Sequence, residues 1–181
     1  GPAVNPLGPY LAASLAAGEV FKRARGLTRG RFADSFGYSL WTGAEGRWSE
    51  LADGPGVEGV VVPPIYVVGA GAVGQCLHAL LAASRLGGAY LVTIDDDKHD
   101  KTNLNRCLLA GVNDDKHPKV DVITSVRVAA GLDGIEFNGT VAQYVQRPSE
   151  PRPRADVAHL EANDRYPIVV SAVDKNTSRH D

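Results

Sequence analysis

The chain has 181 residues, of which 44% are hydrophobic and 22% charged, with a formal net charge of −2 at pH 7. This length allows one complete hydrophobic core with an extension, and the near-neutral charge gives no basis for a nucleic-acid partner. The sequence has neither an apolar run of about 18 residues nor a secretory signal, so we expect no membrane association. Cys76 and Cys107 form no CxxC pair, so we expect a reducing, cytoplasmic environment and no zinc site.

The first residues are predicted to form a packing helix. Apolar side chains recur at helical spacing between Tyr10 and Phe21, after a lead-in at Asn5-Pro6. The helix ends in a basic run that includes Arg23 and Arg25. These arginines are interpreted as a solvated face, or alternatively as contacts to a phosphate in the same chain or in a second copy.

A short strand is expected at residues 36–40, with a return strand near Trp48 and Leu51. No complete core can be drawn from residues 1–60 alone. We therefore predict a helical arm with a short β extension over residues 1–60, and one α/β domain over residues 61–181.

The stretch from Ile65 to Asp97 is predicted to be a strand, a glycine turn, a helix and a second strand. In the GxGxxG pattern, Gly69 permits the tight turn and Gly71 lets a phosphate approach the backbone. Gly74 allows the helix to pack closely on the strand. Free N–H groups at the helix start then favour an anion, so the sequence predicts a nucleotide-binding unit.

Asp95 ends the second strand about 20 residues after the glycine turn, where an acidic residue contacts the ribose of a bound nucleotide. The same turn can also serve only to pack a helix in an α/β domain. Its place between a strand and a helix, with this acid following, favours nucleotide binding over that alternative.

The remaining elements complete a Rossmann-like, mostly parallel sheet flanked by helices. We expect a loop at 98–106, a helix from Pro118 to Ala130 and a strand at 135–137. The next segment, 140–145, is expected to be a loop or strand, and 148–153 a proline-rich connector. The strand at 168–173 is expected to be buried on both faces and to end in Asp174.

Polar residues lie at the predicted carboxyl ends of these strands. They are the glycine turn, Asp95-Asp96-Asp97, Asn103-Leu104-Asn105-Arg106 with Lys119 beyond it, and Asp174. Ligands bind at this edge of an open parallel sheet, so we expect these residues to converge. Cations and carboxylates together favour a nucleoside triphosphate with Mg²⁺ over a nicotinamide dinucleotide.

At these residues the sequence resembles the ubiquitin-activating-enzyme superfamily, the ThiF and MoeB type of adenylating enzymes. The shared motifs are Gly69 to Gly74, Asp95 with Asp97, Asn103 to Arg106, Pro118-Lys119 and Asp174. The resemblance covers about residues 64 to 181. The opening NPLGPYLAASLAAGEVFK also looks like the N-terminal helix of some bacterial members.

The resemblance implies adenylation of the C-terminal carboxylate of a ubiquitin-like or sulfur-carrier protein, usually one ending in Gly-Gly, with ATP and Mg²⁺. We expect a homodimer, in which an N-terminal arginine such as Arg23 or Arg25 reaches the partner's phosphates. Among the site residues, Asp95 would bind the ribose, and Asp174 would bind Mg²⁺ with Asp97 as a second contact. Asn103, Arg106 and Lys119 would hold the phosphates, and Arg106, Lys119 and Asp174 would support the reaction.

Two other readings of these residues stay open. One is a nicotinamide-dependent oxidoreductase, and the other is a non-catalytic scaffold half that pairs with a complete subunit. Structural roles for individual residues are also possible: Lys119 as an exposed first-turn residue, Asp174 as a helix cap and Arg106 as the partner of an acid.

Cys107 stands where the family commonly has glutamine, and Cys76 and His78 are expected to pack. Family members that transfer the activated protein to a thiol use a cysteine beyond the equivalent of Asp174. The sequence ends at Asp181, so we expect a truncated chain or a missing partner segment.

Overall fold

The computed structural model describes residues 5–27, 35–56, 62–84, 90–147 and 167–173. The chain is divided into two compact units, Gly1–Glu58 and Gly59–Asp181. Within the described residues, no helix combines the length and apolar character that crossing a membrane would require.

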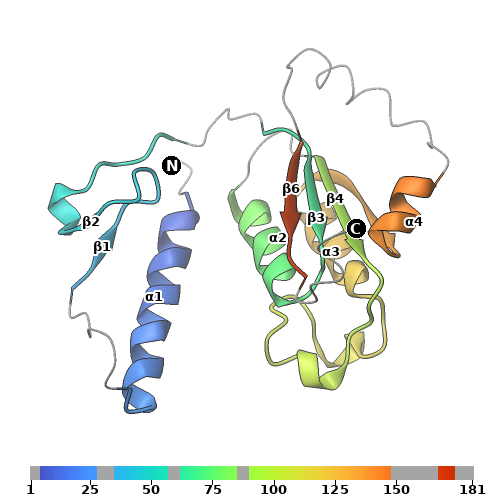
Figure 1. The fold of residues 1–181 in the computed structure, drawn as a ribbon, viewed down its shortest axis with the longest axis horizontal. Helices are drawn as coiled ribbons and strands as arrows, with labels where there is room; N and C mark the ends of the chain where they lie inside the picture. Colours follow the sequence, from blue (N-terminus) through green and yellow to red (C-terminus); the bar gives the residue numbers. More distant parts are fainter. Residues whose placement is uncertain (1–4, 28–34, 57–61, 85–89, 148–166, 174–181) are drawn as a thin grey trace. The chain divides into compact units, whose positions relative to one another are not determined.

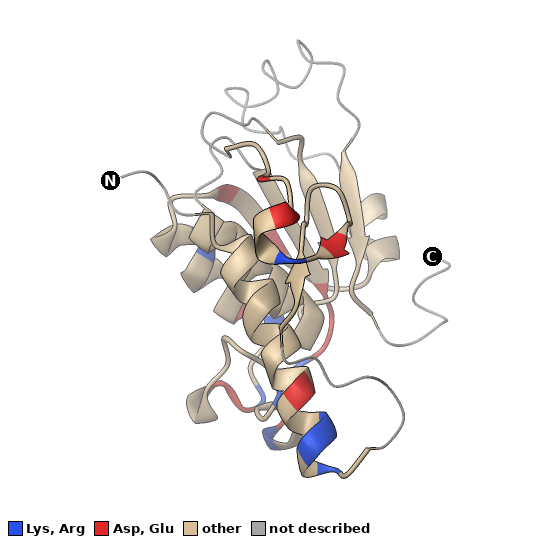
Figure 2. Ribbon diagram, turned by 90° about the vertical axis from the view of Figure 1, so that its left-hand side faces the viewer, with Lys and Arg blue, Asp and Glu red and all other residues tan. Residues whose placement is uncertain are grey.

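In the first unit, the predicted helix is α1 (Leu7–Ala24). The side chain of Asn5 accepts a hydrogen bond from the Leu7 N–H group at 3.0 Å, and the chain leaves the helix through Gly26, whose φ is +59°. The last turn of α1 is basic, with Lys22 and Arg23, and Figure 2 shows this end of the helix in blue. None of its described side chains is buried.

The short β extension pairs earlier in the chain than predicted. Strand β1 (Gly37–Tyr38) pairs antiparallel with β2 (Glu45–Gly46), because the Gly43 N–H group donates to the Ser39 carbonyl at 2.8 Å and closes the turn there. The predicted return strand near Trp48 and Leu51 is wrong, because residues Trp48–Glu50 form a 3₁₀ helix, η1.

The second unit contains a parallel sheet of strands β3 (Ile65–Val68), β4 (Tyr90–Asp95), β5 (Asp133–Asn138) and β6 (Ile168–Ser171). Their spatial order is β5-β4-β3-β6, and each neighbouring pair is parallel (Figure 1). The chain moves outward from β3 to β5 and then returns to the other side of β3. In open α/β sheets, ligands bind outside the carboxyl ends of the strands at such a reversal of strand order. The predicted α/β fold with a Rossmann-like parallel sheet is confirmed.

Helices α2 (Ala72–Ser84) and α3 (Lys119–Ala129) contact each other, and both pack against the sheet. The core under α2 contains Ile65, Val67 and Leu91, which lie on the same face because strand residues alternate between faces. A second buried cluster contains Ala70 of the glycine turn and Val120 and Ile123 of α3, and other hydrophobic side chains pack against it. The glycine turn is therefore tied to α3 through buried side chains.

Residues Val141–Gln146 form a helix, α4, where the sequence led us to expect a loop or strand. Thr140 caps it by accepting the Gln143 N–H group at 3.2 Å, and the Gln143 side chain accepts the Thr140 N–H group in return. This capping box outweighs the β-branched residues of the segment. Tyr144 then packs edge-on against Phe137.

Strand β6 differs from the expectation of burial on both faces. Ile168 is 44% and Val169 66% exposed. The reason is its position, because in the described part of the chain β6 pairs with β3 and lies at the edge of the sheet.

Candidate functional site

The glycine turn between β3 and α2 uses its three glycines for different purposes. Gly69 has a φ of +103°, and a Cβ placed there would lie 2.8 Å from the Ala172 carbonyl oxygen. A Cβ on Gly74 would lie only 2.0 Å from the Gly69 carbonyl oxygen, whereas one on Gly71 would have no heavy atom within 4 Å. Gly69 and Gly74 are therefore required by close packing, and Gly71 borders open space.

Helix α2 begins at Ala72, within the glycine turn itself. Its first N–H groups lack acceptors within the helix, as at any helix start. They lie directly after the open position at Gly71, so this turn can accept an anion such as a phosphate.

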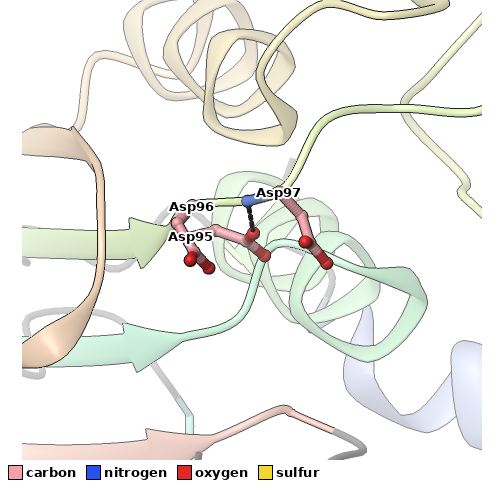
Figure 3. Close-up of side chains that lie close together, drawn as sticks. All are labelled: Asp95, Asp96 and Asp97. Carbon is pink, nitrogen blue, oxygen red and sulfur yellow. Dashed lines mark hydrogen bonds between the residues drawn. The ribbon is translucent and has the colours of Figure 1, made fainter.

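Asp95 at the end of β4 holds the turn in place. Its carboxylate accepts the Ala70 N–H group at 2.5 Å and the Asp97 N–H group at 2.7 Å, the latter drawn in Figure 3. Burial raises the pKa of Asp95, while these N–H groups and the charge of Lys119 act to lower it. Each carboxylate oxygen retains lone-pair capacity for a further donor.

The carboxylates of Asp95, Asp96 and Asp97 gather at the end of β4, with their ligand atoms within 4.8 Å of one another (Figure 3). Carboxylate oxygens are the ligands that Mg²⁺ prefers. The donor set therefore fits a divalent cation. Asp174, the other predicted metal ligand, lies outside the described residues.

Lys119 is brought to these carboxylates from the start of α3. Its Nζ lies 2.7 Å from Asp97 Oδ2, and its side chain is 13% exposed. Burial lowers the pKa of Lys119, but the hydrogen bond to Asp97 and the nearby negative charges outweigh it and raise the pKa. The ammonium group therefore stays charged beside the glycine turn.

The pairing of Lys119 with Asp97 depends on how the intervening loop closes. The Lys119 N–H group donates to the Asp97 carbonyl at 2.9 Å, and the His99 N–H group donates to the His117 carbonyl at 2.8 Å. Lys98 and Pro118 form an antiparallel bridge between them. The two ends of the loop are thus paired like strands, which brings β4 and the start of α3 together.

Asn103 and Arg106 lie within this loop. Residues Lys101–Asn103 form a 3₁₀ helix, η2, which Asp100 caps by accepting the Thr102 N–H group at 3.0 Å. The exposed Arg106 guanidinium donates to the Thr102 carbonyl at 2.8 Å and also to the Asn103 side chain. The two predicted phosphate contacts are therefore joined to each other and oriented by the loop.

Two buried polar residues near the site were assigned no role from the sequence. His99 is 1% exposed, and in the described part of the chain neither ring nitrogen has a hydrogen-bond partner. Burial lowers its pKa. Gln75 is fully buried and bonds both to the glycine turn and to Leu109. No spacing rule points to that contact, because the two residues are 34 positions apart.

The histidine and cysteines near the turn can be compared with the expectation that they pack. His78 is buried as expected, and Cys107 is also buried, which raises the pKa of its thiol. Cys76 is exposed, so the expectation that it packs is wrong. Its neighbours on α2, Gln75 and His78, occupy the face of the helix that is turned inward.

Comparison with known proteins identifies a matching family. The model of the ThiF family matches residues 56–181. No curated protein matches the chain significantly.

Similar solved structures include E. coli MccB with succinimide, at 23% identity over 48% of this chain and 26% of that one, with a TM-score of 0.42. A selenomethionine form of PaaA is 24% identical over 59% of this chain and 30% of its own, with a TM-score of 0.40. E. coli MccB with ATP is 20% identical over 54% and 32% of the two chains, with a TM-score of 0.42. The chain thus spans less than a third of the length of these solved chains.

Proposed function

The chain belongs to the ThiF family, and on that basis we propose that it is an ATP-dependent adenylating enzyme. Its proposed substrate is the C-terminal carboxylate of a ubiquitin-like or sulfur-carrier protein, typically one ending in Gly-Gly. The observation that carries the proposal is the meeting of the open glycine turn with the Asp97–Lys119 ion pair at the carboxyl end of β4. Backbone amides that can accept a phosphate, a largely buried ammonium group and carboxylates then stand at one sheet edge.

In the proposed reaction, a carboxylate oxygen of the carrier attacks the α-phosphorus of ATP. The bond from that phosphorus to the bridging oxygen breaks, and pyrophosphate leaves with the electron pair. The chain acts by positioning the reactants and by neutralising the charge on the leaving group. No protein nucleophile is needed for this step.

Each site residue has a proposed part in this reaction. Gly71 and the first N–H groups of α2 would hold phosphate oxygens, and Asp95 would accept hydrogen bonds from the ribose hydroxyls. Asn103, Arg106 and Lys119 would contact the β- and γ-phosphates. Their positive charge would stabilise the developing pyrophosphate.

A magnesium ion would be held by Asp97 and Asp174, and when bound it neutralises charge on the triphosphate. The exposed carboxylates at the end of β4 support this assignment, because they offer oxygen ligands beside the turn. Asp97 would then exchange its ion pair with Lys119 for the cation, which would release the ammonium group toward the phosphates.

The proposal extends to the assembly and to the later fate of the product. We propose a homodimer in which Arg23 or Arg25, both exposed at the end of α1, approaches the partner's phosphates. Transfer of the activated carrier to a thiol would require a segment other than the described residues.

ATP–pyrophosphate exchange with Gly-Gly-tailed carrier proteins tests the proposal directly. Lys119→Ala should lower the exchange rate by about 100-fold, because it removes a charge from the site of the leaving group. Lys101→Ala is the matched control, since Lys101 is exposed in the same loop, and it should retain the wild-type rate.

Absence of both exchange and Mg-ATP binding in the wild-type protein would refute the proposal. Tight NADH binding without competition from ATP would favour a nicotinamide-dependent oxidoreductase. Wild-type ATP binding after Lys119→Ala, without exchange in either protein, would favour a non-catalytic scaffold subunit.

A further inference from the structure

Gln75 is a buried polar residue whose hydrogen-bonding capacity is used across the site. It lies in the first turn of α2 and is fully buried. Its Nε2 donates to the Ala70 carbonyl at 3.0 Å, and its Oε1 accepts the Leu109 N–H group at 2.9 Å. A carbonyl can only accept and an N–H group can only donate, so these partners determine the orientation of the amide.

On one side, the amide secures the glycine turn. The Ala70 N–H group donates to Asp95, and the Ala70 carbonyl accepts from Gln75. The two peptide groups that flank Ala70 are therefore each bonded to a different element. The Ala70 side chain is buried against Val120 and Ile123 of α3 and its neighbours, which leaves the turn little freedom to move.

On the other side, the Gln75 amide secures the segment that carries Arg106. The N–H groups of Arg106 and Cys107 both donate to the Asn103 carbonyl at 3.1 Å, and the Ala110 N–H group donates to the Cys107 carbonyl at 3.4 Å. Leu109 itself packs against the buried cluster. Successive turns thus connect Leu109 to Arg106, so the position of Leu109 constrains the position of Arg106.

We propose that Gln75 is a positioning residue that sets the separation between the glycine turn and the Asn103–Arg106 loop, so that both reach the phosphates of one nucleotide. This inference rests on the proposed function. Removing the amide leaves a carbonyl and an N–H group buried without partners, and the loop regains alternative positions. Arg106 then loses its alignment although its own side chain is intact.

The first test compares Gln75→Leu with Gln146→Leu, the same substitution at an exposed position of α4. Isothermal titration with Mg-ATP on the full chain measures the Kd, and thermal unfolding measures the folded state. Gln75→Leu should raise the Kd by about 10- to 100-fold, in proportion to a buried hydrogen bond left unmade. Gln146→Leu should leave the Kd unchanged.

A double-mutant cycle with Arg106→Ala separates positioning from a general effect on folding. If Gln75 acts through Arg106, Gln75→Leu should change the Kd by less than about twofold in the Arg106→Ala background. An equal loss in both backgrounds would overturn the inference.

Gln75→Glu supplies a readout that folding alone would not produce, and it also serves if Gln75→Leu does not fold. A protonated carboxyl group has one donor and one acceptor, as the amide has, whereas the ionised form has no donor for the Ala70 carbonyl. The affinity of this variant for ATP, relative to wild type at each pH, should therefore recover as the pH falls from 8 to 5.5. A ratio independent of pH would contradict the inference.

The outcomes separate the two proposals. A wild-type protein that does not bind ATP refutes the proposed function and this inference with it. A wild-type protein that binds ATP, together with a Gln75→Leu variant that binds it equally well, overturns only the positioning role of Gln75.

Discussion

Gly74 and Gly71 of the glycine turn are glycines for different reasons. Gly74 must lack a side chain because the Gly69 carbonyl occupies the place that a Cβ would take, 2.0 Å away. Gly71 meets no such obstacle, and its backbone borders open space. The first requirement belongs to folding, and the second is proposed to belong to the approach of a phosphate.

Alanine at the two positions should therefore have opposite consequences. Gly74→Ala should lower the free energy of unfolding by about 3 kcal/mol or more, because the added methyl group displaces the turn from α2. Gly71→Ala should change that free energy by less than about 1 kcal/mol and still weaken ATP binding. Chemical denaturation and titration with Mg-ATP measure the two quantities, and equal destabilisation by both substitutions would contradict this division.

Asp97 and Lys119 illustrate a second residue-scale effect. The Lys119 Nζ and Asp97 Oδ2 atoms form an ion pair at 2.7 Å, although the family resemblance implies Mg²⁺ binding by Asp97 and phosphate binding by Lys119. The Lys119 side chain is largely buried and its pKa is raised, so its ammonium group stays charged while it pairs with Asp97. The assigned roles stay predictions, and they require this pair to separate when the nucleotide binds.

Polar contacts also fix how the helices lie on the sheet. Arg127 Nε of α3 lies 2.6 Å from Glu136 Oε1 of β5, and both side chains are largely buried. The Thr124 hydroxyl donates to the same carboxylate at 3.0 Å. His78 of α2 has Nδ1 2.8 Å from the Gly74 carbonyl and Nε2 2.8 Å from the Thr93 hydroxyl of β4. Helix α3 is thus joined to β5, and helix α2 to β4, by a polar contact between the helix and the sheet.

The contact between α2 and β4 should make stability depend on pH. Burial lowers the pKa of His78, and of the facing charges Glu136 acts to raise it and Arg127 to lower it. The unfolded chain therefore binds the proton more readily, so the contribution to stability is present above pH 6.5 and is lost as the pH falls below that value.

His78→Asn keeps a donor for the Gly74 carbonyl but does not titrate, so its stability should fall less steeply between pH 7 and 5. The difference in slope is at most about 1.4 kcal/mol per pH unit, the limit for one proton. Urea denaturation at a series of pH values measures it, and Cys76→Ser, at an exposed position of the same helix, should follow the wild type. Parallel curves for wild type and His78→Asn would show that His78 does not set the slope.

At the scale of the whole molecule, the buried cores belong to one of the two units. Both hydrophobic clusters are built from residues of the unit Gly59–Asp181. Helix α1 of the other unit has no buried side chain among its described residues. The predicted boundary near residue 60 stays a prediction.

A fragment of residues 59–181 should therefore unfold in a single cooperative transition, because it retains both clusters and the parallel sheet. A fragment of residues 1–58 should show no such transition, because α1 needs a partner surface to remain helical. Circular dichroism during thermal unfolding distinguishes the two. A cooperative transition in the shorter fragment alone would place the independent folding unit at the other end of the chain.

Much of the α/β unit could be predicted from local patterns. The glycine turn, the strand before it and Asp95 after it depend on residues close together in sequence, and the structure places them as predicted. Periodic apolar residues predicted α3 within a residue or two of its observed ends. These features could be read from the sequence because backbone conformation responds to neighbouring residues.

The predictions were wrong where the local sequence signals for secondary structure were ambiguous, or where burial depends on the rest of the chain. The segment at 140–145 has β-branched residues, yet its Thr140–Gln143 capping box, which is a local sequence signal, makes it a helix. The apolar run of β6 was expected to be fully buried, but its place at the edge of the described sheet leaves it exposed. A hydrophobic strand pattern does not state how many neighbours the strand will have.

The sequence by itself therefore determined the fold class and the family motifs. Only the tertiary structure decided that Lys119 pairs with Asp97 and that Gln75 joins the glycine turn to Leu109. The physical reason is that a turn or a helix start depends on adjacent residues. A contact across 22 or 34 positions depends instead on how the complete chain packs.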